Sequence, residues 1–266
     1  MKRGAELLKP FLLVVVIVSC ILPASAKKKE RVPDPAWVGI TARGRMLAEY
    51  DVAAWRATDA VMALNPVKGN APSYIAKKTD AGWVVAFGRF DDTRDKFLIV
   101  YLATQGATPQ EFKAAQNIPF QEDRGFFYLG AKAVEACKRT FQGENRPYNF
   151  AVLPAEAGQM YVYIYPAQTK KGIYPLGGDV RYLISADVSA ILEKRQLHKS
   201  ILEIDPPRIP PGAKAEGGYH THVLSDVPED TDVFYVLTRK PLGSEFIGAG
   251  KRVYKIEPDG TIVDVK

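Results

Sequence analysis

The chain has 266 residues, of which 47% are hydrophobic and 25% are charged, and its formal net charge is +6. This length predicts one or two globular domains with a hydrophobic core. The first 26 residues carry three of the 36 basic and one of the 30 acidic residues, so the remainder has a net charge of +4 and lacks the basic footprint of a nucleic-acid-binding protein.

The first 26 residues are predicted to be a secretory signal. Three basic residues precede the apolar run 11–22, and residues 24–26 (Ala-Ser-Ala) have the small side chains that a signal peptidase reads. The apolar run is shorter than the roughly 20 residues that a membrane helix needs, and no later stretch is longer. We therefore expect an exported protein of the periplasm or cell envelope, with no transmembrane span in the mature chain.

The two cysteines have different predicted fates. Residues 17–20 (Ile-Val-Ser-Cys) resemble the lipobox of bacterial lipoproteins, which makes lipidation of Cys20 an alternative to cleavage after Ala26. Cleavage after Ala26 leaves Cys137 alone, so an internal disulfide is excluded. Cys137 lies in a helical pattern with no histidine nearby in sequence, which favours a small buried apolar residue over a nucleophile.

The N-terminal half is predicted to mix helices and strands. Residues 27–42 are charged and contain prolines, which is typical of a tether. Apolar residues at three- and four-residue spacings predict a helix over 45–64 and a second over 127–141. Residues 82–90 and 96–104 are rich in β-formers and are joined by turn-forming residues, which predicts an antiparallel hairpin.

The following region is predicted to be β-rich. Strand-like segments separated by short turns fill residues 148–197, and parallel strands would need longer crossovers. The expected fold class is α+β, in which an N-terminal helix and a second helix pack on a mainly antiparallel sheet. A domain over 43–204 is followed by a Pro-rich connector (205–212) and a small C-terminal β-rich segment (213–266), which we expect to pack on the main domain.

A histidine pair marks the candidate metal site. In an extended strand, residues i and i+2 point to the same face, so His220 and His222 would project together. Two imidazoles are natural zinc ligands, and a carboxylate is expected as the third. The candidates for that third ligand are Asp232, Asp226 and Asp230. His198 is a further candidate ligand.

Zinc at such a site could support hydrolysis, because the ion lowers the pKa of a water molecule. The reaction also needs a general base. Glu216 is the candidate for this catalytic role, and Glu203 is the alternative.

Residues 216–254 resemble the metal motif of the JAB/MPN metalloproteases. That motif has two histidines separated by one residue, followed by a serine and an aspartate at the start of a helix. His220 and His222 match the histidine pair, and Asp232 stands one residue before the aspartate position, which Val233 occupies. Asp230 stands in place of the serine. The resemblance implies a zinc-dependent peptidase.

Three alternating tyrosines form a second candidate site. In a strand, Tyr161, Tyr163 and Tyr165 share one face, where the rings offer apolar area with polar tips for a peptide or glycan. The alternative is that this face packs under a helix. The histidine pair likewise has a purely structural alternative, in which its imidazoles bind backbone groups.

Two functions are therefore carried forward. The first is a binding or accessory module of the cell envelope, whose partner is an envelope component, a peptide or a glycan. The second is a zinc-dependent hydrolase centred on His220 and His222. The chain contains no GxSxG, CxxC or HExxH motif, which excludes the chemistries that depend on them.

Overall fold

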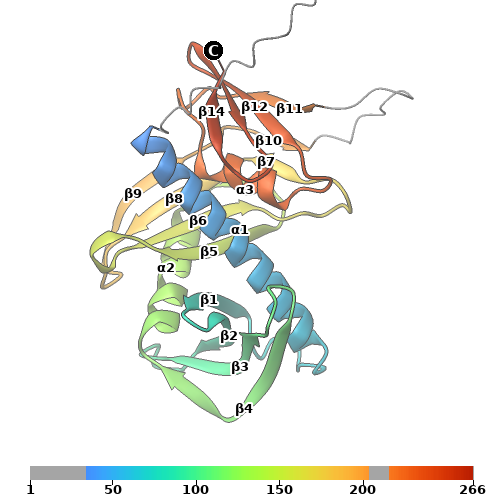
Figure 1. The fold of residues 1–266 in the computed structure, drawn as a ribbon. Helices are drawn as coiled ribbons and strands as arrows, with labels where there is room; N and C mark the ends of the chain where they lie inside the picture. Colours follow the sequence, from blue (N-terminus) through green and yellow to red (C-terminus); the bar gives the residue numbers. More distant parts are fainter. Residues whose placement is uncertain (1–33, 204–215, 266) are drawn as a thin grey trace, which may run out of the picture. The chain divides into compact units, whose positions relative to one another are not determined.

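The computed structural model describes residues 34–203 and 216–265, which fold as α+β, as predicted (Figure 1). Helices pack with several mainly antiparallel sheets. The predicted signal, the lipidation of Cys20 and the Pro-rich connector lie outside the described residues. Among the described residues, no helix has both the length and the apolar character needed to cross a membrane.

The first helix, α1 (Pro35–Met62), is 28 residues long and begins inside the stretch that was predicted to be a tether. Asp34 caps it, because its side chain accepts a hydrogen bond from the backbone N–H of Ala36. Proline suits the first turn of a helix, where its missing N–H has no partner to lose. Asp34 and Pro35, which contributed to the tether prediction, therefore start the helix.

An N-terminal sheet follows α1, with its strands in the order β1-β2-β3-β4 and all neighbours antiparallel. The predicted hairpin is confirmed in the central pair. Its turn is held by Asp91, whose carboxylate accepts hydrogen bonds from two backbone N–H groups. The strands are β1 (Ser73–Thr79), β2 (Gly82–Phe90), β3 (Phe97–Gln105) and β4 (Phe112–Asp123).

The middle sheet is antiparallel throughout, in the order β5-β6-β8-β9, as the short turns predicted. A short pair, β7 (Pro175–Gly177) and β10 (Ile201–Glu203), lies beside it. Helix α2 (Phe126–Thr140) packs between the sheets and buries Cys137, whose pKa is raised to about 12 by burial. The four strands are β5 (Tyr148–Pro154), β6 (Met160–Pro166), β8 (Val180–Ile184) and β9 (Ile191–Gln196).

The C-terminal residues form a third sheet in the order β11-β12-β13-β14. Its first pair is parallel, because helix α3 (Asp230–Thr238) crosses over between the two strands. The strands are β11 (Gly217–Thr221), β12 (Ser244–Ala249), β13 (Arg252–Ile256) and β14 (Ile262–Asp264).

Helix α1 connects the C-terminal sheet to the rest of the protein. Its second half contributes Leu47 and Tyr50 to the core shared by the first two sheets, whereas Ile40 joins the core of the C-terminal sheet. Gly44 sits where α1 meets α3, and a Cβ added there would lie 2.5 Å from the carbonyl oxygen of Asp230. The absence of a side chain at this position therefore permits the close approach of the two helices.

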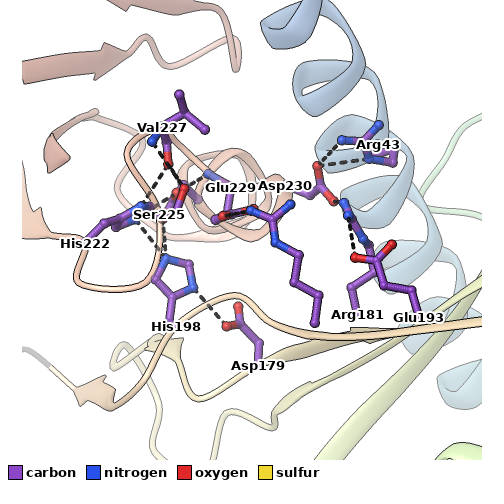
Figure 2. A network of polar contacts seen from close by, with 12 residues as sticks. Arg43, Asp179, Arg181, Glu193, His198, His222, Ser225, Val227, Glu229 and Asp230 are labelled. Carbon is purple, nitrogen blue, oxygen red and sulfur yellow. Dashed lines mark hydrogen bonds and ion pairs between the residues drawn. The ribbon is translucent and has the colours of Figure 1, made fainter. Parts of the chain in front are cut away.

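A buried ion network also joins α3 to its neighbours (Figure 2). One carboxylate oxygen of Asp230 accepts hydrogen bonds from Arg43 at 2.9–3.0 Å, and the other accepts from Arg181 at 2.7 Å and from the Tyr163 hydroxyl at 2.8 Å. The Asp230 side chain is completely buried. Groups from α1, β6 and β8 thus balance one charge on α3.

Replacing Asp230 with Ala is expected to lower the free energy of unfolding by about 3–5 kcal/mol, because it leaves the guanidinium of Arg181 buried without its partner. Chemical denaturation followed by circular dichroism measures this change. The control is Lys78→Ala, which breaks a half-exposed pair with Glu49 and should cost less than about 1 kcal/mol. Equal effects of the two substitutions would contradict the role given to Asp230.

Candidate metal centre

Four side chains from separate parts of the chain converge beside α3. Their potential ligand atoms all lie within 4.8 Å of one another. His220 belongs to β11, His222 lies just after it, and Asp232 is in the first turn of α3. The fourth side chain, His198, lies between β9 and β10.

The first turn of α3 fixes the carboxylate of Asp232. A reciprocal capping box is present, in which Oδ2 of Asp232 accepts from the backbone N–H of Glu229 at 2.6 Å and the Glu229 side chain accepts from the backbone of Asp232. The other oxygen, Oδ1, lies 3.0 Å from Nε2 of both His198 and His220. The cap therefore aims one oxygen at the histidines.

Strand β11 brings two histidines to the same point, as the i, i+2 spacing predicted. The Nε2 atoms of His220 and His222 lie 3.2 Å apart. His220 pairs in register with Ile247 of β12, and the backbone N–H of His222 continues the pairing to the carbonyl of Gly248 at 2.8 Å. The sheet hydrogen bonds thus set the position of both rings.

Each imidazole is oriented through its other nitrogen, Nδ1. The partners of Nδ1 are Asp179 for His198 at 2.8 Å, Glu245 for His220 at 2.9 Å, and the carbonyl oxygen of Val227 for His222 at 3.0 Å. A carbonyl oxygen only accepts, so Nδ1 of His222 carries the proton. The carboxylates of Asp179 and Glu245 favour the same tautomer on the other two rings, and Asp232 at Nε2 opposes it unless a cation balances its charge. In their neutral forms, all three histidines therefore direct the lone pair of Nε2 into the cluster.

The groups that hold the Nδ1 atoms are themselves fixed by further hydrogen bonds and ion pairs. The Ser225 hydroxyl donates to the carbonyl of Val227 at 2.7 Å, as Figure 2 shows beside His222. Glu245 is buried and ion-paired with Arg239. Such outer contacts fix the tautomer and ring orientation of histidine ligands in metal sites.

The electrostatics of the cluster follow from four electron-pair donors that face one another. Burial disfavours the charged form of His220, but hydrogen bonds to Asp232 and Glu245 outweigh this effect and raise its pKa to about 9. The pKa of His198 is raised well above its usual value, because Asp179 and Asp232 overcome its burial. The imidazoles in turn hold the pKa of Asp232 well below its usual range, against the effect of burial. Protons or a metal cation must therefore balance the cluster.

Several of the distances approach those around a tetrahedral zinc ion, with His198 and His220 facing Oδ1 of Asp232 and His222 facing Oδ2. Zinc–nitrogen bonds of 2.0–2.1 Å place two ligand atoms about 3.3 Å apart. Nε2 of His222 lies 3.0 Å from Nε2 of His198, 3.2 Å from Nε2 of His220 and 3.2 Å from Oδ2 of Asp232. These three distances are within a few tenths of an ångström of zinc-ligand spacing, whereas the whole set of ligand atoms is grouped to within 4.8 Å. Imidazole and carboxylate are also ligand types that zinc accepts.

A pocket of about 290 Å³ adjoins the histidine side of the cluster. All three histidines line it, together with Ser200 and Thr221. Most of its other lining is apolar, from Leu176, Leu197, Leu202, Tyr219, Val223 and Leu224. Small molecules could therefore approach the cluster from this side.

The structure brings together four of the candidate ligands and separates Asp226 and Asp230 from them. His220, His222 and Asp232 meet, and His198 completes the set. Asp230 belongs to the arginine network. Two further candidates lie outside the cluster: Asp226, which is exposed, and Glu216, an exposed residue just before β11. Glu203, the other candidate base, pairs with Arg146.

The sequence did not predict which groups hold the Nδ1 atoms of the three histidines. Asp179 contacts His198 because the pairing of β8 with β9 places Asp179 beside Leu197. Glu245 and the carbonyl of Val227 carry no local pattern that marks them. Their roles follow only from the pairing of β11 with β12 and the loop that precedes α3.

The three tyrosines share one face of β6, as alternation predicted. Two of their hydroxyls are engaged within the protein, since Tyr163 donates to Asp230 and Tyr165 donates to Asp51 at 2.7 Å. Tyr161 is half-buried, and the guanidinium of Arg181 lies 5.1 Å from its ring centre. Ligand binding by this face stays a prediction.

No protein-family model, curated protein or solved structure matches this chain. The geometry of the molecule itself therefore carries the functional argument.

In the metal-free protein, stability is expected to fall as the pH rises from about 6.5 to about 9. The raised pKa of His220 means that the folded state holds a proton that the unfolded state has released in this range. Its contribution is complete below the unfolded value of 6.5 and is lost as pH passes the folded value. Urea denaturation in a chelator across this range measures it. A His220→Ala variant should show a weaker dependence, and an unchanged one would contradict the assignment.

Proposed function

We propose that this protein is a zinc-binding accessory module of the cell envelope, with His198, His220, His222 and Asp232 as the zinc ligands. The observation that carries the proposal is the convergence of three Nε2 atoms and one carboxylate, with every Nδ1 held by an acceptor. The predicted secretory signal supports the assignment to the envelope.

A zinc ion here would link distant segments. The four ligands come from the end of the middle sheet, from β11 and from α3, so one ion would hold the C-terminal sheet to the main body. Four protein ligands complete a tetrahedron, which is the arrangement of structural zinc sites. The side chains of the ligands are buried, the most exposed being His198 at 9%. Burial favours a role in stability over rapid exchange of the ion.

The test is metal content by elemental analysis of protein purified without a histidine tag. We expect close to one zinc per chain and its loss in a His220→Ala/His222→Ala double variant. Zinc added to chelator-treated protein should raise the melting temperature, because an ion that binds only the folded state stabilises it by about 2.7 kcal/mol at 100 times its Kd. The double variant should not respond.

The matched control is Asp226→Asn. Asp226 lies between the histidine pair and Asp232 in sequence, but it is outside the cluster and exposed. This variant should keep its zinc, whereas Asp232→Asn should bind zinc more weakly. Absence of zinc from the wild-type protein, together with no thermal response to added zinc, would overturn the proposal.

A zinc-dependent hydrolase is the second candidate function. The pocket beside the three histidines favours it, since a substrate could reach the ion from that side. A catalytic site keeps a position for water or substrate, so the ion would have to expand its coordination beyond the four protein ligands. The resemblance to the JAB/MPN metalloproteases suggests a peptide as substrate.

The hydrolase hypothesis predicts cleavage of a fluorogenic peptide library by the zinc-loaded protein. Glu216→Gln should lower the rate at least tenfold while zinc content stays unchanged, if Glu216 is the general base. Glu203→Gln is the control, because that carboxylate already pairs with Arg146. Full zinc occupancy without cleavage would leave the accessory role as the function of the site.

A further inference from the structure

A second cavity, of about 350 Å³, is lined by residues of α1, β5, β6 and α3. None of the four residues of the metal cluster lines it. Its volume is in the range of small-molecule sites. The lining residues used below are Asp51, Trp55, Asn149, Tyr165, Gln168 and Tyr174.

Asp51 provides a carboxylate with unused acceptor capacity. Its Oδ1 accepts from the Tyr165 hydroxyl at 2.7 Å, the one hydrogen bond to this side chain within the described part of the chain. Burial raises the pKa of Asp51, and the bond from Tyr165 opposes that rise. An ionised carboxylate accepts several hydrogen bonds, so Oδ2 is left for a ligand that donates.

Three amide side chains line the same cavity as this carboxylate. The side chain of Asn149 makes no hydrogen bond to any described residue, although it lines the cavity. Gln168 uses its amide nitrogen to bind the carbonyl of Lys170, which leaves its oxygen as an acceptor. Gln110 uses its oxygen to accept from Arg56, which leaves its NH₂ group as a donor. Donors and acceptors are therefore both present.

Aromatic rings supply the apolar part of the cavity. Trp55 is 57% exposed, which is unusual for so large a side chain on a packed helix. The guanidinium of Arg56 lies 4.2 Å from its ring centre. Tyr174 also lines the cavity, and Phe234 packs edge-on against Tyr165 at 5.0 Å. Such rings offer flat apolar area next to polar groups.

We propose that this cavity binds a neutral saccharide. A sugar ring has hydroxyls that both donate and accept, which suits Asp51 and the amides, and an apolar C–H face, which suits the exposed Trp55 ring. The charges in the lining have both signs, with Asp51 opposed by Arg56 and Lys240, and this balance selects against a strongly charged ligand. The site is independent of the zinc ligands.

The test is isothermal titration of the purified protein with four neutral tetrasaccharides, built from glucose in α and β linkage, mannose and N-acetylglucosamine. We expect at least one to bind, with quenching or enhancement of tryptophan fluorescence. Asp51→Asn keeps an oxygen for Tyr165 but replaces an acceptor with a donor, and it should weaken binding about tenfold or more. Trp55→Ala should have a similar effect.

The matched control is Met62→Ala. Met62 lies on the same helix, is 60% exposed and does not line the cavity, so this variant should bind like the wild type. Trp55 is exposed, so its variant tests the site even if Asp51→Asn unfolds. No binding of any tetrasaccharide at millimolar concentration, or binding unchanged in Trp55→Ala, would overturn the proposal. Cavity-dependent binding of a tetrapeptide library instead would overturn the saccharide assignment. Zinc content measured on the same samples keeps this result separate from the metal site.

Discussion

Two completely buried carboxylates in the first turn of α3 constrain how the chain packs. Asp230 and Asp232 are two residues apart, and a buried charge is strongly unfavourable unless other groups balance it. Asp230 is balanced by Arg43 of α1 and Arg181 of β8. Asp232 is balanced by imidazoles from the end of the middle sheet and from β11. The first turn of one short helix thus requires α1, the middle sheet and the C-terminal sheet to meet.

The two carboxylates differ in how permanent their partners are. Guanidinium groups stay charged at every pH that the folded protein meets, so the Asp230 network is constant. Imidazoles are charged only when protonated, and their Nδ1 partners point the remaining lone pairs at Asp232. The second anchor of α3 therefore depends on bound protons or on a metal cation. The balance of Asp232 changes with pH or with a bound cation, whereas that of Asp230 is permanent. This difference is the physical basis for proposing a metal at the cluster and a structural role for the arginines.

Local patterns predicted the local features of this chain. The β2–β3 hairpin, helix α2 and the shared face of His220 and His222 each depend on residues close in sequence. Strands β1 and β4 carried too many polar residues for a strand pattern, because they lie at the edges of their sheet. The partners of the histidines were not predicted, since Asp179 and Glu245 reach them through the register of strand pairs, which no local pattern reveals. The alternation of side chains in a strand predicted that Tyr163 and Tyr165 share a face. It did not predict their hydrogen bonds to Asp230 of α3 and Asp51 of α1.

Gly44 gives the contact between α1 and α3 a wider importance. A Cβ at this position would meet the backbone of Asp230 and the side chain of Val233 at 2.5 Å, and backbone cannot yield as a flexible side chain does. A larger residue would therefore push the first turn of α3 away from α1, and the carboxylate of Asp232 would move with it. Gly44 contacts no histidine, yet a larger side chain at this position would displace Asp232 from the candidate metal cluster. Substitutions that weaken the candidate metal site are thus expected in α1 as well as at the four ligand positions.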